Sequence, residues 1–223
     1  MKLYIDGHEF EARPDQSLFD IIKELGLYSG KLSSDPLVAK LAGRVFTLNY
    51  VPLRSKDVSP DRATIRKAME ASGGIVRLFR YDHPTGREAY ARTAQFIVFL
   101  AFGRLYPDAV AKMSCTLGNS IYFSVNGAPE FSADELATEI RKVVEEDIPL
   151  LRRIPIDEAV AHYTLAGQND KVRLLKYRAK DYFTIYEHEG YADYFYGEML
   201  PSTSFLRSWS MVEAKDGFIF VLP

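Results

Sequence analysis

The chain has 223 residues, of which 47% are hydrophobic and 26% are charged, and its formal net charge is -2. This composition is typical of a globular protein, and the small net charge excludes a strong overall attraction to nucleic acid or membranes. A single cysteine, Cys115, excludes an internal disulfide framework and a cysteine-rich zinc site. The first residues show no targeting pattern, and the longest apolar run, 96–102, is too short to cross a bilayer. We therefore expect a cytoplasmic protein with no membrane partner.

The first segment begins with an alternating apolar and polar pattern over residues 2–12, interrupted by Asp6-Gly7. Alternation on both sides of an Asp-Gly pair predicts a β-hairpin. Asp15 or Ser17 can then cap a helix whose apolar residues fall at helical spacing, and Gly26 ends that helix. Further strands are expected at 37–41, 45–51 and 75–79, with a short helix at 62–71. A hairpin, a helix and more strands predict a small ubiquitin-like β-grasp domain.

The stretch 82–86, DHPTG, contains a proline, a glycine and a turn-favouring aspartate, and it predicts a loop. We place a domain boundary there, which gives a first domain at 1–83 and a second at 84–223. The second domain should begin with a helix at 87–105, because the pattern is too long for a strand. Its remaining expected elements are a hairpin of strands 112–117 and 120–125, a helix opened by a Ser132/Glu135 capping box, strands at 151–155, 182–187 and 218–222, and helices at 157–166 and 171–177. This order predicts an α+β fold with an antiparallel sheet.

The first segment, with DGHEFEARPDQSLFDIIKELG at 6–26, resembles the TGS domain. That ubiquitin-like module begins threonyl-tRNA synthetases and also occurs in regulatory GTPases. The resemblance implies a binding domain, often for RNA, without catalytic activity of its own.

The second segment contains TAQFIVFLAFGRLYP at 93–107 and DYFYGEMLP at 193–201. Both stretches resemble the editing domain of threonyl-tRNA synthetase. The resemblance implies that the histidine pair of that family falls on Arg92 and Phe96. It also implies that the family's cysteine falls on Phe195 and its last histidine on Met199.

Two histidines four residues apart on a helix point the same way, so they can share a metal or position a water. An arginine keeps its proton, and phenylalanine and methionine offer no general base, so Arg92, Phe96 and Met199 leave ester hydrolysis without a proton carrier. We therefore expect no catalytic residue and no metal site at these degenerate positions. The apolar replacements either fill a collapsed pocket or form a new aromatic one.

A further resemblance concerns VRLLKYR at 172–178 and DYFYGEMLPST at 193–203. These stretches look like the N-terminal region of bacterial uridine-kinase-like proteins, in which TGS and threonyl-tRNA-synthetase-like domains precede a P-loop kinase. This resemblance implies a parent uridine or nucleoside kinase whose kinase domain would follow Pro223. ATP and Mg²⁺ are expected only for that kinase domain, and no cofactor is expected in this segment. The Gly26–Leu32 stretch, GLYSGKL, has the wrong spacing for a Walker A loop.

Basic and aromatic residues concentrate near the end of the second segment. Lys176 and Arg178 could contact phosphates, and Tyr194 and Tyr196 could stack on bases, so these four residues are candidates for binding nucleic acid or a nucleotide. The alternative is a solvated helix face beside an aromatic core, because neighbouring acidic residues dilute the charge.

Three functional hypotheses follow. The first is a noncatalytic recognition or regulatory region of a uridine-kinase-like phosphotransferase, whose partners are tRNA or another RNA and its own kinase domain. The second is a freestanding aminoacyl-tRNA deacylase that uses other groups, such as His162, His188 or Cys115, although Cys115 is expected to be a buried and inert thiol. The third is a scaffold without a ligand.

Overall fold

The computed structural model describes residues 1–54, 60–128, 130–150, 152–165, 169–175 and 182–223. Its contacts divide the chain into two units. Unit 1 comprises Met1–Pro149 and Gly197–Pro223, and unit 2 comprises Leu150–Tyr196. Within the described ranges, no helix has the length and apolarity needed to cross a membrane. The architecture is α+β, with one mixed and two antiparallel sheets.

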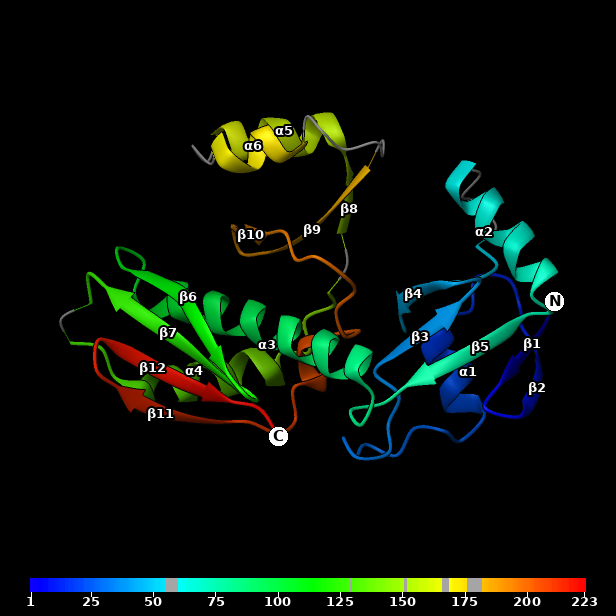
Figure 1. The fold of residues 1–223 in the computed structure, drawn as a ribbon, viewed down its shortest axis with the longest axis horizontal. Helices are drawn as coiled ribbons and strands as arrows, with labels where there is room; N and C mark the ends of the chain where they lie inside the picture. Colours follow the sequence, from blue (N-terminus) through cyan, green and yellow to red (C-terminus); the bar gives the residue numbers. More distant parts are fainter. Residues whose placement is uncertain (55–59, 129, 151, 166–168, 176–181) are drawn as a thin grey trace. The chain divides into compact units, whose positions relative to one another are not determined.

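The first sheet of unit 1 has five strands in the order β2-β1-β5-β3-β4 (Figure 1). The pair β1 and β5 is parallel, and the other neighbours are antiparallel. Asp6 and Gly7, with φ of 45° and 85°, form the tight turn of the first hairpin, which confirms that prediction. The bounds are β1 Lys2–Ile5, β2 His8–Glu11, β3 Val38–Leu41, β4 Arg44–Thr47 and β5 Ile75–Phe79.

Helix α1, Leu18–Glu24, follows the first hairpin and buries Leu18, Ile21 and Ile22. Ser17 is its N-cap: the Ser17 hydroxyl accepts from Asp20 N at 3.1 Å, and Asp20 Oδ2 accepts from Ser17 N at 3.1 Å. This reciprocal capping box decides between the two predicted caps in favour of Ser17. The second helix, α2, spans Pro60–Ala71.

Helix α3, Pro84–Leu105, is the long central helix of unit 1 (Figure 1). The predicted loop at 82–86 is wrong from Pro84 onward, because Pro84 stands at the first helical turn, where its missing N–H is not needed. His83 is the N-cap, and its Nδ1 accepts from Thr85 N at 3.2 Å. Gly86 packs closely under the preceding strand, since a Cβ there would lie 2.0 Å from the Arg80 carbonyl oxygen.

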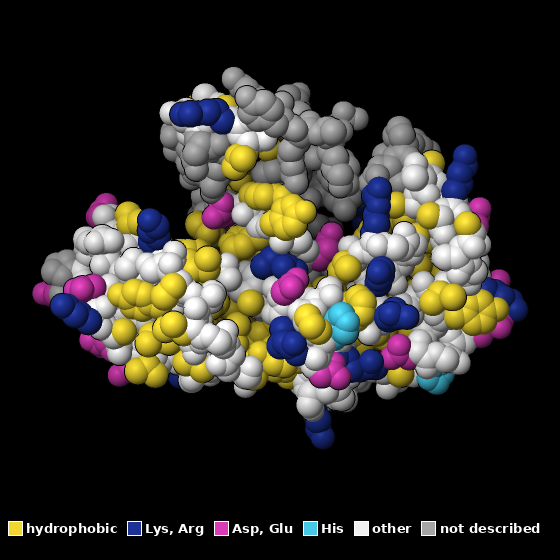
Figure 2. All heavy atoms as spheres, viewed as in Figure 1, with side chains coloured by type: hydrophobic (Ala, Val, Ile, Leu, Met, Phe, Trp, Pro, Cys, Tyr) yellow, Lys and Arg dark blue, Asp and Glu magenta, His cyan; other side chains and the backbone are white. Residues whose placement is uncertain are grey.

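The second sheet of unit 1 is antiparallel, in the order β11-β12-β7-β6, and α3 and α4 cover one of its faces (Figure 1). The predicted hairpin around Gly118 is confirmed, whereas β11 was not predicted. On the face drawn in Figure 2, hydrophobic side chains gather over β6, β7 and β12. The bounds are β6 Val110–Leu117, β7 Ser120–Asn126, β11 Ser210–Ala214, β12 Gly217–Val221 and α4 Ala133–Glu145.

Unit 2 has a three-stranded antiparallel sheet in the order β10-β9-β8 and two helices. Tyr163, Leu175 and Ile185 form its buried core, with Val160 and Tyr194 packed against them. The bounds are β8 Arg152–Pro155, α5 Ile156–Leu165, α6 Asn169–Leu175, β9 Tyr182–His188 and β10 Tyr191–Asp193.

Unit 1 consists of two chain segments, and hydrogen bonds connect the end of the first segment to the start of the second. Pro149 and Ser202 form an antiparallel bridge, and Thr203 N donates to Ile148 O at 3.0 Å. The Thr203 hydroxyl accepts from Ile148 N at 2.9 Å and donates to Val143 O at 2.7 Å. A short 3-10 helix, η1 Thr203–Phe205, follows. The predicted boundary between residues 83 and 84 stays a prediction.

Candidate functional site

The candidate site in unit 1 lies where α3 meets the 197–201 segment. Arg92 and Phe96 stand one turn apart on α3, so they share a face of the helix. Arg92 Nε and NH2 both donate to the Glu198 carbonyl oxygen, at 3.1 and 3.0 Å. The structure thus brings Arg92 to the residue next to Met199, across 106 positions of sequence.

The Arg92 guanidinium is held from two sides. In addition to the bonds to Glu198, its NH1 lies 3.8 Å from Glu88 Oε2, one turn earlier on α3. Its side chain is only 18% exposed. Hydrogen bonds from a charged group are stronger than neutral ones, so the guanidinium fixes the backbone of the 197–201 segment against the helix.

Gly197 allows this close approach. Its φ of 114° lies in the region that favours glycine, and a Cβ built there would lie 2.8 Å from Arg92 Cζ. Any side chain at this position would therefore displace the guanidinium.

Apolar side chains take the other two degenerate positions in unit 1. Phe96 and Met199 have no exposed surface. Thr93, also fully buried, donates to Ala89 O at 3.0 Å and accepts from Leu200 N at 3.0 Å, which ties the segment to α3 a second time. Neither a thioether nor a phenyl ring carries protons near neutral pH, so these residues give the site no acid or base.

The end of β4 and the turn after it also hold the 197–201 segment. Glu198 Oε2 accepts from Thr47 N at 3.4 Å, and Asn49 Nδ2 donates to Pro201 O at 2.7 Å. Sequence reasoning missed Glu198, Thr93 and Asn49. Of these, only Thr93 carried a usable sequence signal, as a polar residue inside an apolar helical run.

The fourth degenerate position, Phe195, belongs to unit 2. Its ring lies 6.3 Å from that of Tyr186 in an edge-on arrangement, at an interplanar angle of 71°. Tyr194 is half-buried against the core of unit 2, whereas Tyr196 is 83% exposed. Lys176 and Arg178 lie outside the described residues. Of the predicted aromatic contacts, only Tyr196 presents a largely exposed ring.

Two tyrosines of unit 2, Tyr163 and Tyr191, have a raised pKa. Burial raises the pKa of both Tyr163 and Tyr191, and the nearby Asp193 carboxylate adds to the effect. These phenols therefore cannot act as bases near neutral pH.

The groups named for an alternative chemistry stand in different units. Cys115 lies on β6 of unit 1 and is exposed, which corrects the expectation of a buried thiol. The reason is that β6 is an edge strand with a register shift between Met113 and Cys115. His188 lies on β9 of unit 2, with Nε2 3.7 Å from Glu189 Oε1. His162 is on α5, and its side chain lies outside the described residues.

Other candidate sites have structural roles. Among the residues that the structure describes, no group of three or more His, Cys, Asp or Glu side chains could hold a metal ion. In the Gly26–Leu32 loop, Ser29 N and Gly30 N donate to the Asp35 carboxylate at 2.7 and 2.9 Å. These amides already bind an internal anion, so the loop is not a phosphate cradle.

No family model matches the chain. Similar proteins are the threonine--tRNA ligases of Nitratidesulfovibrio vulgaris (strain DP4), at 23% identity over 98% of this chain, and of Clostridioides difficile, at 25% over 91%. The ligase of Acetivibrio thermocellus is 25% identical over 64% of the chain. The match spans only part of each relative, namely 32%, 29% and 23% of their lengths in turn. The similarity supports a domain related to part of threonine--tRNA ligase.

Proposed function

We propose that this chain is a tRNA-recognition module of the threonyl-tRNA synthetase type, in which the place of the editing chemistry is closed by Arg92. The observation that carries the proposal is the pair of hydrogen bonds from the Arg92 guanidinium to Glu198 O. They lie at the position that the resemblance assigns to a histidine. In this proposal the fold around that position is kept, while Arg92 fills the position and donates to a backbone oxygen of the chain itself.

The first domain fits the same proposal as a TGS-like module. Its five-stranded order, β2-β1-β5-β3-β4, with the parallel pair β1 and β5, is compatible with a ubiquitin-like β-grasp. The capped helix α1 follows the first hairpin, as the TGS resemblance implies.

The relatives favour a tRNA-directed role over a regulatory region of a nucleoside kinase. The similar proteins named above are all threonine--tRNA ligases, and the similarity to one of them covers 98% of the chain. They give no support to the uridine-kinase interpretation.

A freestanding deacylase is the second candidate, because a ligase that charges tRNA also needs a means to remove wrongly attached amino acids. A pocket for threonine discriminates poorly against serine, which lacks only one methyl group. Such an enzyme would need a proton carrier other than Arg92, Phe96 and Met199. Of the three groups named earlier for this chemistry, Cys115 is exposed and His188 is partly exposed.

The two candidates are separated by one pair of measurements on the same tRNA. The chain is titrated with threonine-specific tRNA in a salt series, and its effect on ester hydrolysis is followed with that tRNA charged with serine or with threonine. We expect saturable binding that weakens as salt rises, with hydrolysis at the rate of buffer alone.

Faster loss of serine than of threonine would establish the deacylase and refute the noncatalytic reading. Variants Cys115→Ser and His188→Gln would then identify the group responsible. A chain that binds no tRNA at any salt concentration and hydrolyses neither ester would refute both candidates.

A further inference from the structure

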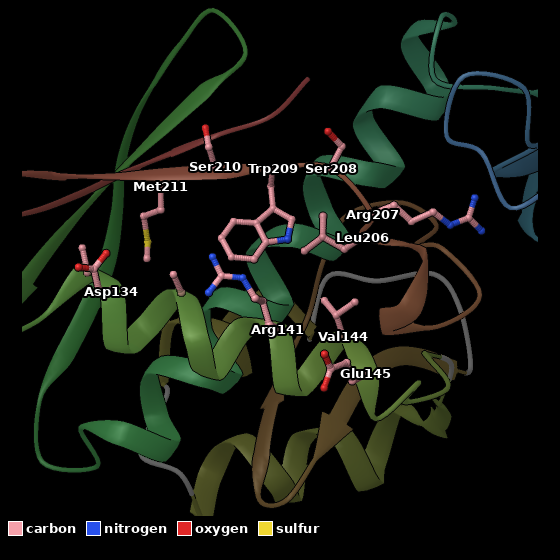
Figure 3. Close-up of a pocket in the computed structure, with 12 residues that line it drawn as sticks. Asp134, Arg141, Val144, Glu145, Leu206, Arg207, Ser208, Trp209, Ser210 and Met211 are labelled. Atoms are coloured by element: carbon pink, nitrogen blue, oxygen red, sulfur yellow. The ribbon is translucent and has the colours of Figure 1, made fainter.

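A separate groove in unit 1 runs between α4 and residues 206–211 (Figure 3). Its volume is about 690 Å³, within the range of roughly 300–1,000 Å³ that is typical of ligand sites. It takes no part in the site around Arg92.

The upper wall of the groove has an alternating, strand-like pattern. Trp209 and Met211 point toward α4, whereas Ser208 and Ser210 point away from it (Figure 3). The Trp209 ring packs on Phe220, with the ring centroids 5.2 Å apart and an interplanar angle of 18°. The position of the Trp209 ring is therefore set by its packing on β12.

This wall continues into β11, which is the outermost strand of the four-stranded sheet. All five residues of β11, from Ser210 to Ala214, pair with β12 on one side. In an antiparallel strand, about half of the backbone N–H and C=O groups face away from the partner strand. The edge of β11 can therefore receive a further strand.

The floor is one face of α4. Ala133, Ala137, Arg141 and Val144 line it at intervals of four, four and three residues. The first two are alanines, which leave room beneath β11. From Ala133 to Val144 the helix rises about 16 Å, because each residue adds about 1.5 Å. An extended chain of about five residues has the same length.

Arg141 gives the groove a cation that can pair with a ligand. Its guanidinium lies over the Trp209 ring at 5.5 Å, and among the described residues it makes no salt bridge. Arg207, by contrast, points out of the groove and pairs with Asp35. The other charged side chains of the lining are Asp134 and Glu145.

We propose that this groove binds a short extended peptide segment, which adds to the edge of β11 and places an acidic side chain against Arg141. Backbone hydrogen bonds to β11 supply affinity, and the side chains that alternate toward α4 supply specificity. The space above Ala137 takes an apolar side chain. Ala137 and Arg141 are about 6 Å apart along the helix, which matches two residues of a strand. The preferred peptide therefore has an apolar residue, then any residue, then an acidic residue at three consecutive positions.

The same features disfavour a nucleic-acid strand. Carboxylates stand at both ends of the groove, at Asp134 and Glu145, and would repel phosphates. Phe220 stacks on the Trp209 ring and Arg141 also lies over it, so the indole is not an open platform for a base.

The test uses a fluorescein-labelled peptide, Thr-Thr-Val-Thr-Glu-Thr-Thr, titrated with the full chain and followed by fluorescence anisotropy. We expect saturable binding that weakens about five- to tenfold when lysine replaces the glutamate, since one close charge pair is lost and a repulsion is added. The variant Arg141→Glu should reverse this preference. The variant Arg77→Glu, a change of the same charge at an exposed residue of β5, should leave binding unchanged.

Two further readouts distinguish strand addition from a contact of side chains alone. N-methylation of the peptide backbone should weaken binding, and bound peptide should slow amide hydrogen exchange in β11. Filling the groove with Ala137→Leu should abolish binding while the thermal unfolding midpoint shows that the variant is folded.

The proposal is overturned if the glutamate and lysine peptides bind equally, or if neither binds. It is also overturned if N-methylation has no effect. Arg141-dependent binding of single-stranded RNA that displaces the peptide would assign the groove to nucleic acid instead. Each of these results is independent of tRNA binding or ester hydrolysis by the site around Arg92.

Discussion

Arg207 NH1 donates to Asp35 Oδ2 at 2.7 Å, and these two residues are 172 positions apart in the sequence. The Asp35 side chain has no exposed surface, and that of Arg207 is 19% exposed. Ser29 N and Gly30 N also donate to the same carboxylate, at 2.7 and 2.9 Å. Arg207 NH2 contacts the hydroxyl of Tyr28. A buried acid thus organises the loop at residues 28–35 and links it to a segment near the C-terminus.

The variant Asp35→Asn should lower the free energy of unfolding by about 2–4 kcal/mol, because it leaves Arg207 without its buried partner. Urea denaturation at neutral pH measures the change. The exposed pair of Arg13 and Glu24 provides the control. The variant Glu24→Gln should cost less than about 1 kcal/mol, since exposed ion pairs contribute little. Equal costs for the two variants would contradict the role assigned to Asp35.

The same variant should also change the pH dependence of stability. Burial acts to raise the pKa of Asp35, but the hydrogen bonds from Ser29 and Arg207 outweigh it and hold the pKa below the ordinary value of 3.8. Because the folded pKa is the lower one, the stability from this group is present above the unfolded pKa and is lost as pH falls through the folded pKa. The difference between wild type and Asp35→Asn should therefore shrink as pH falls below about 4. Denaturation curves at several acidic pH values test this.

Arg92 and Gly197 should show strong energetic coupling. The variant Gly197→Ala should destabilise the chain, because its Cβ would meet the Arg92 guanidinium and its φ of 114° strains any side chain. In an Arg92→Ala background the steric part of this cost disappears, while the backbone part remains. A double-mutant cycle should give a coupling of about 1–3 kcal/mol. Strict additivity would show that the guanidinium does not occupy this place in solution.

Alanine substitutions at two glycines of α3 should change the free energy of unfolding in opposite directions. Gly86→Ala should destabilise by several kcal/mol, of the order of 3, because its Cβ would lie 2.0 Å from the Arg80 carbonyl oxygen. Gly103→Ala is the matched control, since nothing lies within 4 Å of its added Cβ. It should stabilise the helix by about 0.5–1 kcal/mol. The thermal unfolding midpoints of both variants, compared with wild type, show whether each change stabilises or destabilises the protein.

Tyr90 should make stability sensitive to alkaline pH. Its buried hydroxyl donates to Ser208 O and accepts from Ser208 N, each at 2.9 Å, and burial raises its pKa to about 12. Because the folded pKa is the higher one, the stability from this group is present below the unfolded pKa near 10 and is lost as pH rises through about 12. Tyr90→Phe should cost about 1–2 kcal/mol at neutral pH and remove this alkaline loss. An unchanged alkaline profile would show that another group titrates.

Local chemistry made much of the fold predictable. The Asp6-Gly7 and Gly118-Asn119 pairs identified two hairpins, and Ser17 marked the start of α1. The loop predicted at 82–86 failed for a local reason, because Pro84 opens a helix. The other failures involve information from distant parts of the chain. Whether β6 is an edge strand, and hence whether Cys115 is exposed, depends on strand order. The strand β11 was missed because its sequence, SMVEA, has little alternation of apolar and polar residues, and the strand is defined by its pairing with β12.

The candidate site was predictable only in part for the same reason. The spacing of Arg92 and Phe96 on one helix face was readable from sequence. The acceptor of Arg92 was not, because it is a backbone oxygen 106 positions away. Every residue has a backbone carbonyl, so the sequence does not indicate which one accepts the hydrogen bonds of Arg92.

The bridge between Pro149 and Ser202 has a consequence for protein engineering. Unit 1 is discontinuous in sequence: its chain leaves after Pro149 and returns at Gly197, and Pro149 forms an antiparallel bridge with Ser202, five residues after the return. We therefore expect that a short linker between Pro149 and Gly197 can replace unit 2. A chain shortened in this way should keep both sheets of unit 1, the Arg92 contact and the Trp209 groove, so that unit 1 can be studied without unit 2.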